Sequence, residues 1–172
     1  MTDHFMKQWL KRNFQPDYIT DGVHDIDYKD LFDSGVRLLL LDIDNTLAVH
    51  GSHESDNYAK TAIENMKLAG FSVYILSNAR KHRAQSFASG LGVEAEGMAY
   101  KPSPKILLKT CERLQYKQNE TCMIGDQLLT DIWAARRAGV KSILVKPRSA
   151  QESGHIRIKR LIERIILKMI DK

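Results

Sequence analysis

The strongest constraint on the fold is a run of four leucines, Leu38–Leu41, followed directly by two acidic residues. Four apolar residues without a polar interruption are typical of a central strand that helices cover on both faces, as in a parallel sheet. Asp42 and Asp44 come at the end of this strand, where open α/β sheets place their ligands. Because alternate strand residues point to the same side, both carboxylates are predicted to face one site.

This acidic pair has more than one interpretation. Apposed carboxylates repel each other, so the pair indicates either a bound metal ion or a dyad that shares one proton. Asp and Asn are also common in an ordinary turn after a buried strand, and that structural alternative applies to the same residues.

Length and composition limit the classes of protein to consider. The chain has 172 residues, enough for one α/β domain with a sizeable core and too few for two. Cys111 and Cys122 fall among apolar neighbours, which favours two reduced core thiols over a disulfide or a metal pair. No apolar run reaches membrane-spanning length and the first ten residues are interrupted by charges, so we expect a soluble, cytoplasmic protein.

The remaining sequence alternates apolar, β-rich runs with segments of helical periodicity. Strands are predicted at residues 71–76, 93–100, 121–124 and 142–145, in addition to the leucine strand. Strands that alternate with helices indicate right-handed crossovers, so we predict an α/β fold with a doubly wound parallel sheet of about five strands and helices on both faces.

The two ends of the chain are predicted to lie outside this core, which spans residues 31–150. Residues 1–15 have the apolar spacing of a short amphipathic helix, and the acidic, aperiodic residues 16–30 are interpreted as a connector. Residues 151–172 are predicted to form a basic amphipathic helix packed on the core.

Positive charge is concentrated in the last part of the chain. Residues 141–172 hold nine Lys or Arg against three Asp or Glu, which accounts for the formal net charge of +5. In the C-terminal helix we expect an apolar face of Ile158, Leu161, Ile162, Ile165 and Met169 and a basic face of Arg157, Arg160, Arg164 and Lys168. The apolar face is predicted to dock on the core, and the alternative is that the basic face approaches an anionic lipid surface.

Polar residues follow each predicted strand or extended segment. They are Asp42 with Asp44, then Ser77 with Asn78, then Lys101, and finally Asp126 with Asp131 nearby. In a parallel sheet these ends share one edge, so the residues are expected to meet. Several carboxylates with a hydroxyl and an ammonium group match Mg²⁺ and a phosphate group, although each piece alone could be a turn, a helix cap or a solvated side chain.

Two histidines in the loop after the leucine strand are further candidate metal ligands. His50 and His53 lie in a Gly/Ser-containing segment, where a solvated loop is the favoured interpretation.

The ordered set of polar residues resembles the haloacid dehalogenase superfamily. The segment Asp42-Ile43-Asp44-Asn45-Thr46-Leu47 looks like its motif I, and Ser77 resembles motif II. Lys101 with Pro102 resembles motif III, while Gly125-Asp126 followed by Asp131 resembles motif IV. The resemblance implies a Rossmann-like core and a phosphatase that acts through a phospho-aspartate.

The same resemblance implies a role for each residue. Asp42 would be the nucleophile and Asp44 the general acid and base. Mg²⁺ would be held by Asp42, the main-chain carbonyl of Asp44, and Asp126. Ser77, Asn78 and Lys101 would bind the phosphoryl group. Thr46 and Asp131 would support these inner residues, with Asp131 acting either on metal-bound water or as an N-terminal charge on the helix from Leu128.

The spacing of the motifs leaves no room for a cap domain, because 32 residues separate Asp44 from Ser77 and 23 separate Ser77 from Lys101. The chain therefore resembles the capless class, whose open sites suit bulky or surface-presented phosphates, unless an oligomer supplies the lid. Its layout is similar to the YqeG-type family, which is related to mitochondrial phosphatidylglycerophosphate phosphatases.

Two other functions remain as alternatives. The positive charge would suit a nucleic-acid end phosphatase, although no aromatic stacking platform is evident. A phosphate-binding module without turnover would be expected to lack one of Asp42, Asp44, Lys101 or Asp126, and the chain has all four.

Overall fold

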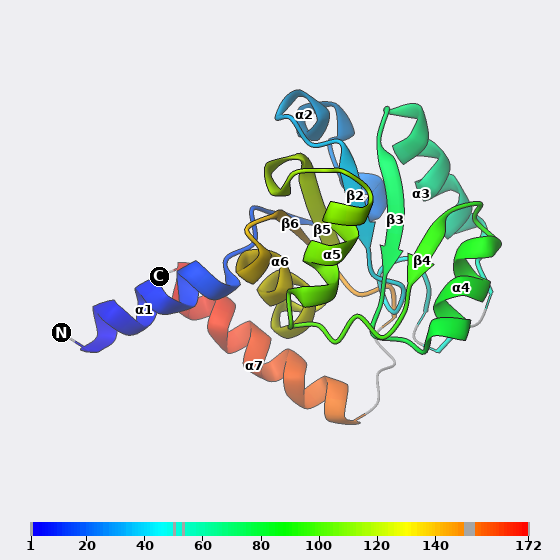
Figure 1. Cartoon of the computed structure of the whole chain (residues 1–172). Coiled ribbons are helices and arrows are strands. Elements are labelled where there is room, and N and C mark those ends of the chain that lie inside the picture. The colour runs from blue at the N-terminus through cyan, green and yellow to red at the C-terminus, as the bar shows by residue number, and fades with distance from the viewer. Residues whose placement is uncertain (1, 50, 53, 150–153, 172) are drawn as a thin grey trace.

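A computed structural model of the chain describes residues 2–49, 51–52, 54–149 and 154–171. Its centre is one sheet of six parallel strands in the order β1-β6-β5-β2-β3-β4 (Figure 1). The strands are β1 Tyr18–Thr20, β2 Leu38–Leu41, β3 Ser72–Leu76, β4 Glu94–Glu96, β5 Thr121–Gly125 and β6 Lys141–Val145.

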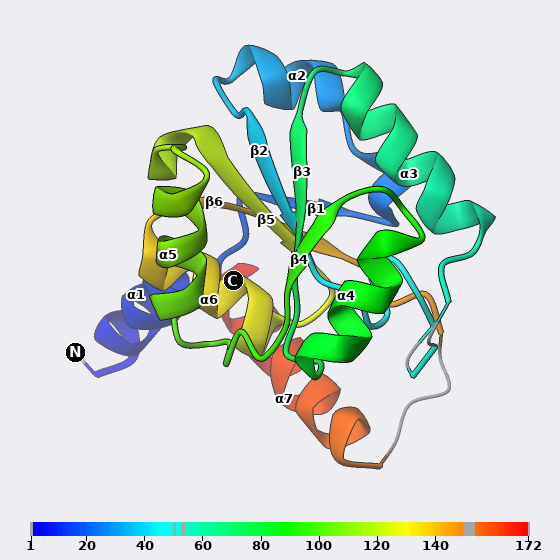
Figure 2. The ribbon, with the colours of Figure 1, turned by 45° about the vertical axis from the view of Figure 1, so that its right-hand side comes forward.

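Helices cover both faces of the sheet, which confirms the doubly wound α/β prediction. The α-helices are α1 Thr2–Phe14, α2 Tyr28–Asp33, α3 Asn57–Leu68, α4 Lys81–Ser89, α5 Lys105–Arg113, α6 Trp133–Ala138 and α7 Gly154–Asp171. Short helical turns lie at Val23–Asp25, Gln118–Glu120 and Leu128–Ile132, the last of them a π-helix that leads into α6. Helices α3 and α4 lie on one side of the sheet and α5 and α6 on the other (Figure 2).

Strand β2 is the centre of the core, as its four leucines predict. Leu39 and Leu41 pack on the α3 and α4 side, whereas Leu38 and Leu40 pack on the α5 and α6 side. All four side chains are fully buried. Burial of one such side chain contributes about 1.5–3 kcal/mol, so this strand fixes the position of the acidic residues that follow it.

The prediction that residues 16–30 are only a connector is wrong. Tyr18–Thr20 form the edge strand β1, which pairs in parallel with β6 through Tyr18 and Ile143. Three residues are too few to show strand periodicity, and the partner strand lies far along the chain, so local sequence carried no sign of this pairing.

A third apolar cluster joins the two ends of the chain. Phe14 of α1 packs with residues of the Leu128–Ile132 turn and of α7. In α7 the buried residues are Ile156, Glu163, Ile166 and Ile170. Helices α1 and α7 lie side by side, and the first turns of α7 reach the carboxyl edge of the sheet (Figures 1 and 2).

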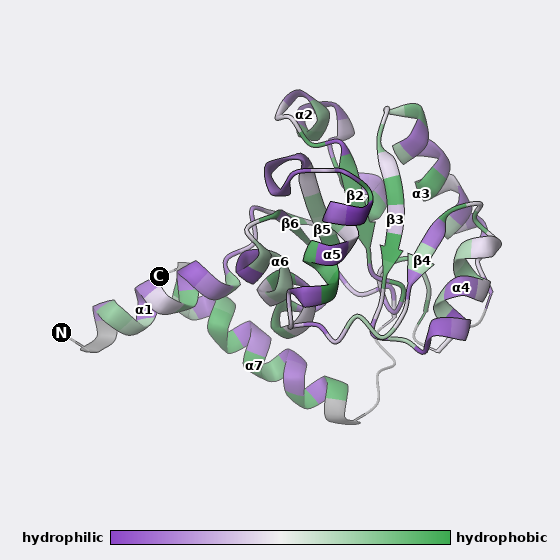
Figure 3. Cartoon of the chain, viewed as in Figure 1, coloured by the Kyte–Doolittle hydropathy of each residue, from purple (hydrophilic) through white to green (hydrophobic). Residues whose placement is uncertain are grey.

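The apolar face predicted for α7 is largely on the outside of the molecule. Ile158, Leu161, Ile162 and Ile165 are 65, 60, 45 and 50% exposed, and only Met169 of the predicted face is partly buried in the cluster. The helix carries a second apolar stripe at helical spacing, and the core takes that one. Hydrophobic and hydrophilic residues therefore alternate around the visible surface of α7 (Figure 3).

No cap domain interrupts the described part of the core. The chain between Asp44 and Ser77 contains α3 and β3, and the chain between Ser77 and Lys101 contains α4 and β4. Within the described residues, no inserted domain covers the carboxyl edge of the sheet, and the first turns of α7 lie beside it.

Two further expectations concern thiols and membrane spans. Cys111 and Cys122 are both buried free thiols, and burial raises the pKa of each. Within the described ranges, no helix combines the length and apolar character needed to cross a bilayer.

Candidate active site

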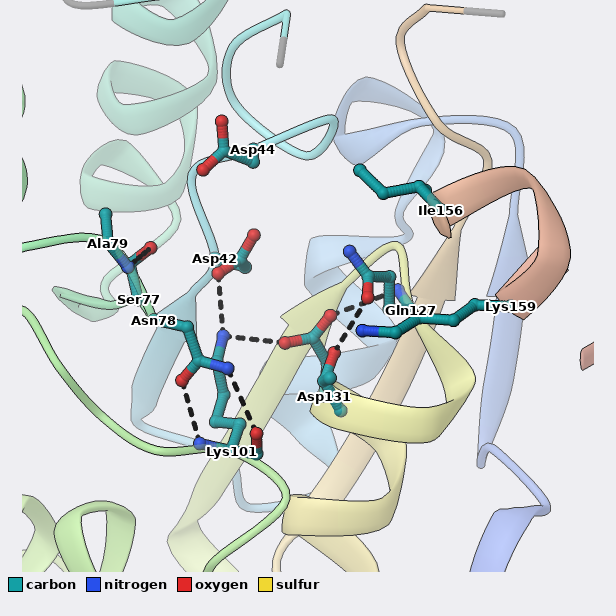
Figure 4. A pocket seen from close by; sticks show the side chains of 11 residues that line it. Asp42, Asp44, Ser77, Asn78, Ala79, Lys101, Gln127, Asp131, Ile156 and Lys159 are labelled. Carbon is teal, nitrogen blue, oxygen red and sulfur yellow. Dashed lines mark hydrogen bonds and ion pairs between the residues drawn. The ribbon is translucent and has the colours of Figure 1, made fainter. Parts of the chain in front are cut away.

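Most of the predicted polar residues converge on a pocket at the carboxyl edge of the sheet, whereas Asp126 and Thr46 are not among the residues that line it (Figure 4). The pocket has a volume of about 250 Å³. It is lined by the predicted residues Asp42, Asp44, Ser77, Asn78, Lys101 and Asp131, and also by Gln127, Thr130, Ile156 and Lys159. Strand ends β2, β3 and β5 and the first turns of α7 thus contribute to one site.

Lys101 is the electrostatic centre of the site. Its ammonium group lies 2.7 Å from Asp42 Oδ1 and 2.6 Å from Asp131 Oδ1, and it donates to the Leu76 carbonyl at 2.8 Å. Burial alone would lower the pKa of Lys101, but the carboxylates of Asp131 and Asp42 raise it above its usual value. Lys101 is therefore a permanent buried cation between two carboxylates.

Asp42 occupies a site where its own charge is unfavourable. Burial, together with the carboxylates of Asp131 and Asp44, raises the pKa of Asp42 to about 6, and Lys101 opposes that rise. Its main-chain N–H donates to the Ile124 carbonyl of β5, which fixes the residue at the end of β2. An ionised carboxylate held in this way is suited to act on an incoming group once a further cation is present.

Two local backbone features hold the acidic residues in position. Asn45 has φ 59°, a left-handed conformation that Asn tolerates better than most residues, and it turns the chain sharply after Asp44. A Cβ at Gly125 would lie 2.4 Å from the Asp131 carboxyl carbon, so only glycine leaves room for this carboxylate beside β5.

Asp44 lies at the mouth of the site and pairs with a residue that the sequence did not suggest. Arg83 of α4 donates to Asp44 Oδ2 at 2.7 Å and to Oδ1 at 2.8 Å, and the Gly51 N–H also donates to Oδ1 at 2.9 Å. The Asp44 carboxylate in turn raises the pKa of the Arg83 guanidinium. The Asp44 carboxylate is thus held apart from the buried carboxylates of Asp42, Asp126 and Asp131.

The side chains of Ser77 and Asn78 form hydrogen bonds with the main chain around the site. Ser77 is buried, and its hydroxyl accepts from the Ala79 N–H at 3.2 Å. The Asn78 amide binds the main chain of Lys101 in both directions, at 2.8 and 3.0 Å, so it positions that lysine. Thr46 is buried, and its hydroxyl has no hydrogen-bond partner within the described parts of the chain.

Three carboxylates could hold a metal ion. Asp42, Asp126 and Asp131 each offer an oxygen, and these oxygens lie within 4.8 Å of one another. Asp126 Oδ1 is buried and accepts no hydrogen bond from the residues that the structure describes. Because clustered carboxylate oxygens suit a hard divalent cation, the residues present fit such an ion. Asp44 is outside this side-chain cluster, and in the prediction it contributes only its main-chain carbonyl.

Sequence reasoning did not identify Arg83, Gln127, Ile156 or Lys159 as site residues. Arg83 lies in the first turn of α4, the helix that follows Ser77, and this place shortly after a strand end was the available signal. Ile156 and Lys159 belong to α7, whose position against the pocket depends on tertiary packing. His50 and His53 lie outside the described residues.

Comparison with known proteins agrees with this combination of fold and site. Residues 8–139 match the family model for haloacid dehalogenase-like hydrolases. The match covers most of the chain, and the chain belongs to this family. The chain is therefore an enzyme of the hydrolase class.

One curated relative resembles nearly the whole chain. The probable phosphatase YqeG of Bacillus subtilis strain 168 is 31% identical over 163 residues, which cover 95% of each chain. Among solved structures, an uncharacterised protein from Listeria monocytogenes serotype 4b superposes with a TM-score of 0.55 at 17% identity, covering 80% of this chain and all of that one. The 3-deoxy-D-manno-octulosonate 8-phosphate phosphatase of Yersinia pestis gives a TM-score of 0.53 at 16% identity and covers 85 and 88% of the two chains. These two structural matches show the shared fold.

Proposed function

We propose that this protein is a Mg²⁺-dependent phosphatase that hydrolyses phosphomonoesters through a phosphorylated Asp42. The main support is the buried array in which Lys101 contacts both Asp42 and Asp131, with Asp126 completing the cluster of carboxylates. The similarity to a probable phosphatase over nearly the whole chain supports the same reaction class.

The metal would be held by Asp42, Asp126 and the main-chain carbonyl of Asp44. Asp131 is close enough to bind the ion or its water ligands. When bound, Mg²⁺ would offset the negative charge that accumulates on phosphoryl oxygens in the transition state.

In the first step, a carboxylate oxygen of Asp42 attacks phosphorus and the bond to the leaving oxygen breaks. Asp44 donates a proton to that oxygen. The Lys101 ammonium offsets the charge of the phosphoryl oxygens, and the Ser77 hydroxyl donates a hydrogen bond to one of them. In the second step, Asp44 takes a proton from water as the water oxygen attacks phosphorus. Inorganic phosphate leaves and the Asp42 carboxylate is restored.

Asp44 cannot donate a proton while both of its oxygens accept hydrogen bonds from Arg83. Substrate binding should therefore loosen at least one of these bonds. Arg83 would then remain near the leaving group as a further cation.

The size of the pocket supports a choice of substrate class. A volume of about 250 Å³ accommodates a phosphoryl group and some of the atoms next to it but not a whole lipid, and no cap encloses it within the described chain. The rest of the substrate would lie on the protein surface, where α7 presents exposed isoleucines and several cations. We therefore propose a bulky phosphate at an anionic lipid surface, with phosphatidylglycerophosphate as the first candidate and peripheral membrane attachment.

The reaction is tested with the purified chain and phosphomonoesters presented on lipid, sugar, nucleotide and the 5′ end of single-stranded DNA. We expect Mg²⁺-dependent release of phosphate that chelation abolishes, with the lipid substrate preferred. Preference for the DNA end would favour the nucleic-acid alternative, and phosphate binding without release would favour a binding module. Beryllofluoride in a crystal should be attached to Asp42; attachment at another residue would contradict the assignment of the nucleophile.

A further inference from the structure

Arg160 of α7 reaches the tip of β5 and binds Asp126. Its guanidinium donates to Asp126 Oδ2 and to the Asp126 main-chain carbonyl. The Arg160 side chain is 14% exposed and the Asp126 side chain is fully buried. Arg160 was predicted to be part of the outward basic face of the C-terminal helix, so the structure corrects that prediction.

Glu163, one turn further along α7, completes this contact. Its Oε2 accepts from Arg160 at 3.1 Å, and its Oε1 accepts from the main-chain N–H of Leu129 at 3.1 Å. Leu129 belongs to the π-helical turn that also carries Asp131. Arg160 and Glu163 thus tie α7 to both acidic residues of the β5 region.

The two oxygens of Asp126 have different surroundings. Oδ2 is held by Arg160, whereas Oδ1 is buried and receives no hydrogen bond from any described residue. A cation that takes Oδ1 need not displace the guanidinium.

We propose that Arg160 is a positioning residue for the metal site. It holds Asp126 through Oδ2 and fixes its rotamer, so that Oδ1 is available to a divalent cation, and it makes α7 part of the active site. This inference rests on the metal dependence in the proposed function. Its opposite is that Arg160 acts as a resident cation that Mg²⁺ must displace.

The two possibilities change metal affinity in opposite directions. Removing a residue that orients a metal ligand commonly weakens metal binding by about 10- to 100-fold. Removing a competing cation would tighten binding.

The test is calorimetric titration of the full chain with Mg²⁺, compared between the wild type, Arg160→Gln and Arg160→Lys. Arg164→Gln is the matched control, because Arg164 is an exposed arginine of the same helix. We expect Arg160→Gln to bind Mg²⁺ about 10-fold more weakly than the wild type. Arg160→Lys should have an intermediate affinity, because lysine keeps the positive charge but lacks the paired N–H donors of the guanidinium. Arg164→Gln should keep the wild-type affinity. Thermal unfolding in chelator verifies that each variant is folded.

Equal or tighter Mg²⁺ binding by folded Arg160→Gln overturns the inference. If that variant does not fold, Arg160→Lys decides, and wild-type affinity there overturns it equally. A wild-type chain that binds no Mg²⁺ would instead remove the metal from the proposed function, so the two failures can be told apart. Turnover supplies a second readout: Arg160→Gln should regain much of its lost activity at high Mg²⁺, because the chemistry at Asp42 is unchanged.

Discussion

Some charged side chains of the site are buried where their charge lowers the stability of the folded protein. Asp42 is buried near the carboxylates of Asp131 and Asp44, and the cation that it pairs with, Lys101, is shared with Asp131. A carboxyl group whose folded-state pKa is raised binds protons more readily in the folded than in the unfolded state. The contribution of Asp42 to the free energy of unfolding therefore falls as pH rises from about 4 to 6. The resulting destabilisation is fully present at pH 7.

Asp42→Asn should abolish turnover and also stabilise the metal-free protein. The pKa of about 6 corresponds to a gain of about 1–3 kcal/mol in the free energy of unfolding at pH 7. Urea unfolding in chelator should show this gain at pH 7 and a smaller one near pH 3, where Asp42 is mostly protonated in both the folded and the unfolded state. A loss of stability at pH 7 would contradict the electrostatic description of Asp42.

Asp44→Asn should affect substrates according to their leaving groups. We expect a loss of about 10²- to 10⁴-fold with alkyl phosphates, because the alkoxide needs a proton as it leaves. The loss in the first step should be smaller with nitrophenyl phosphate, whose leaving group is stable without one. Single-turnover kinetics provide the measurement, and Mg²⁺ affinity should change little. Equal losses for both substrates would exclude Asp44 as the acid.

Helix α3 illustrates how an element next to the site is anchored. Asp56 caps its N-terminus by accepting from the Ala59 N–H at 3.0 Å, and Arg148 binds the same carboxylate at 2.8 Å. Arg148 also donates to the Leu47 carbonyl at 2.6 Å, so one arginine links the segment after β6, the helix cap and motif I. Hydrogen bonds from Arg148 hold the pKa of Asp56 below its usual value.

Asp56→Ala should destabilise the protein by about 1 kcal/mol at pH 7, the usual cost of a lost helix cap. A lowered folded-state pKa means that the contribution is complete above the unfolded pKa and disappears as pH falls through the folded value. The difference between wild type and variant should therefore be constant from pH 7 to 5 and shrink below about pH 4. Asp56→Asn, which keeps an acceptor for the cap, is the control and should lose less. A difference that shrinks between pH 7 and 5 would contradict this assignment.

On the scale of the whole molecule, the net charge lies in the two terminal helices. Helix α7 has five Lys or Arg against two Asp or Glu, and α1 has three against one, which together equal the net +5 of the chain. The same helices expose large apolar residues: Phe5, Met6 and Trp9 on α1, and Ile158, Leu161, Ile162 and Ile165 on α7. Apolar side chains flanked by cations suit an anionic bilayer, whereas two copies of this face would bring like charges together.

Changing Arg157, Arg164 and Lys168 to Gln should weaken binding to phosphatidylglycerol vesicles. Each basic residue near an anionic membrane contributes about 1 kcal/mol, so three should cost about two orders of magnitude in affinity at low salt. Arg160 is left unchanged because it belongs to the site. Gln at the exposed residues Lys29, Lys60 and Lys109 matches the charge change and should have little effect. Wild-type protein that does not sediment with vesicles at low ionic strength would remove the membrane surface from the proposal.

Local sequence determined the α/β class, the central position of Leu38–Leu41 and the order of the polar strand ends. These follow from the period of apolar residues and from the rule that parallel strands end at one edge. The sequence therefore predicts that Asp42, Lys101 and Asp131 lie close together. In the structure, Lys101 is within ion-pair distance of both carboxylates.

Only the tertiary structure decided which partners these residues have. Three of these contacts join segments that are distant in sequence, and none of them has a local periodic signal. They are the pairing of β1 with β6, the ion pair of Arg83 with Asp44 and the ion pair of Arg160 with Asp126. For α7, helical spacing allowed two apolar stripes, and packing against α1 and the Leu128–Ile132 turn selected one. That selection turned Arg160 towards Asp126 and left Ile158 and Leu161 facing outward, because a helix that buries one side must expose the other.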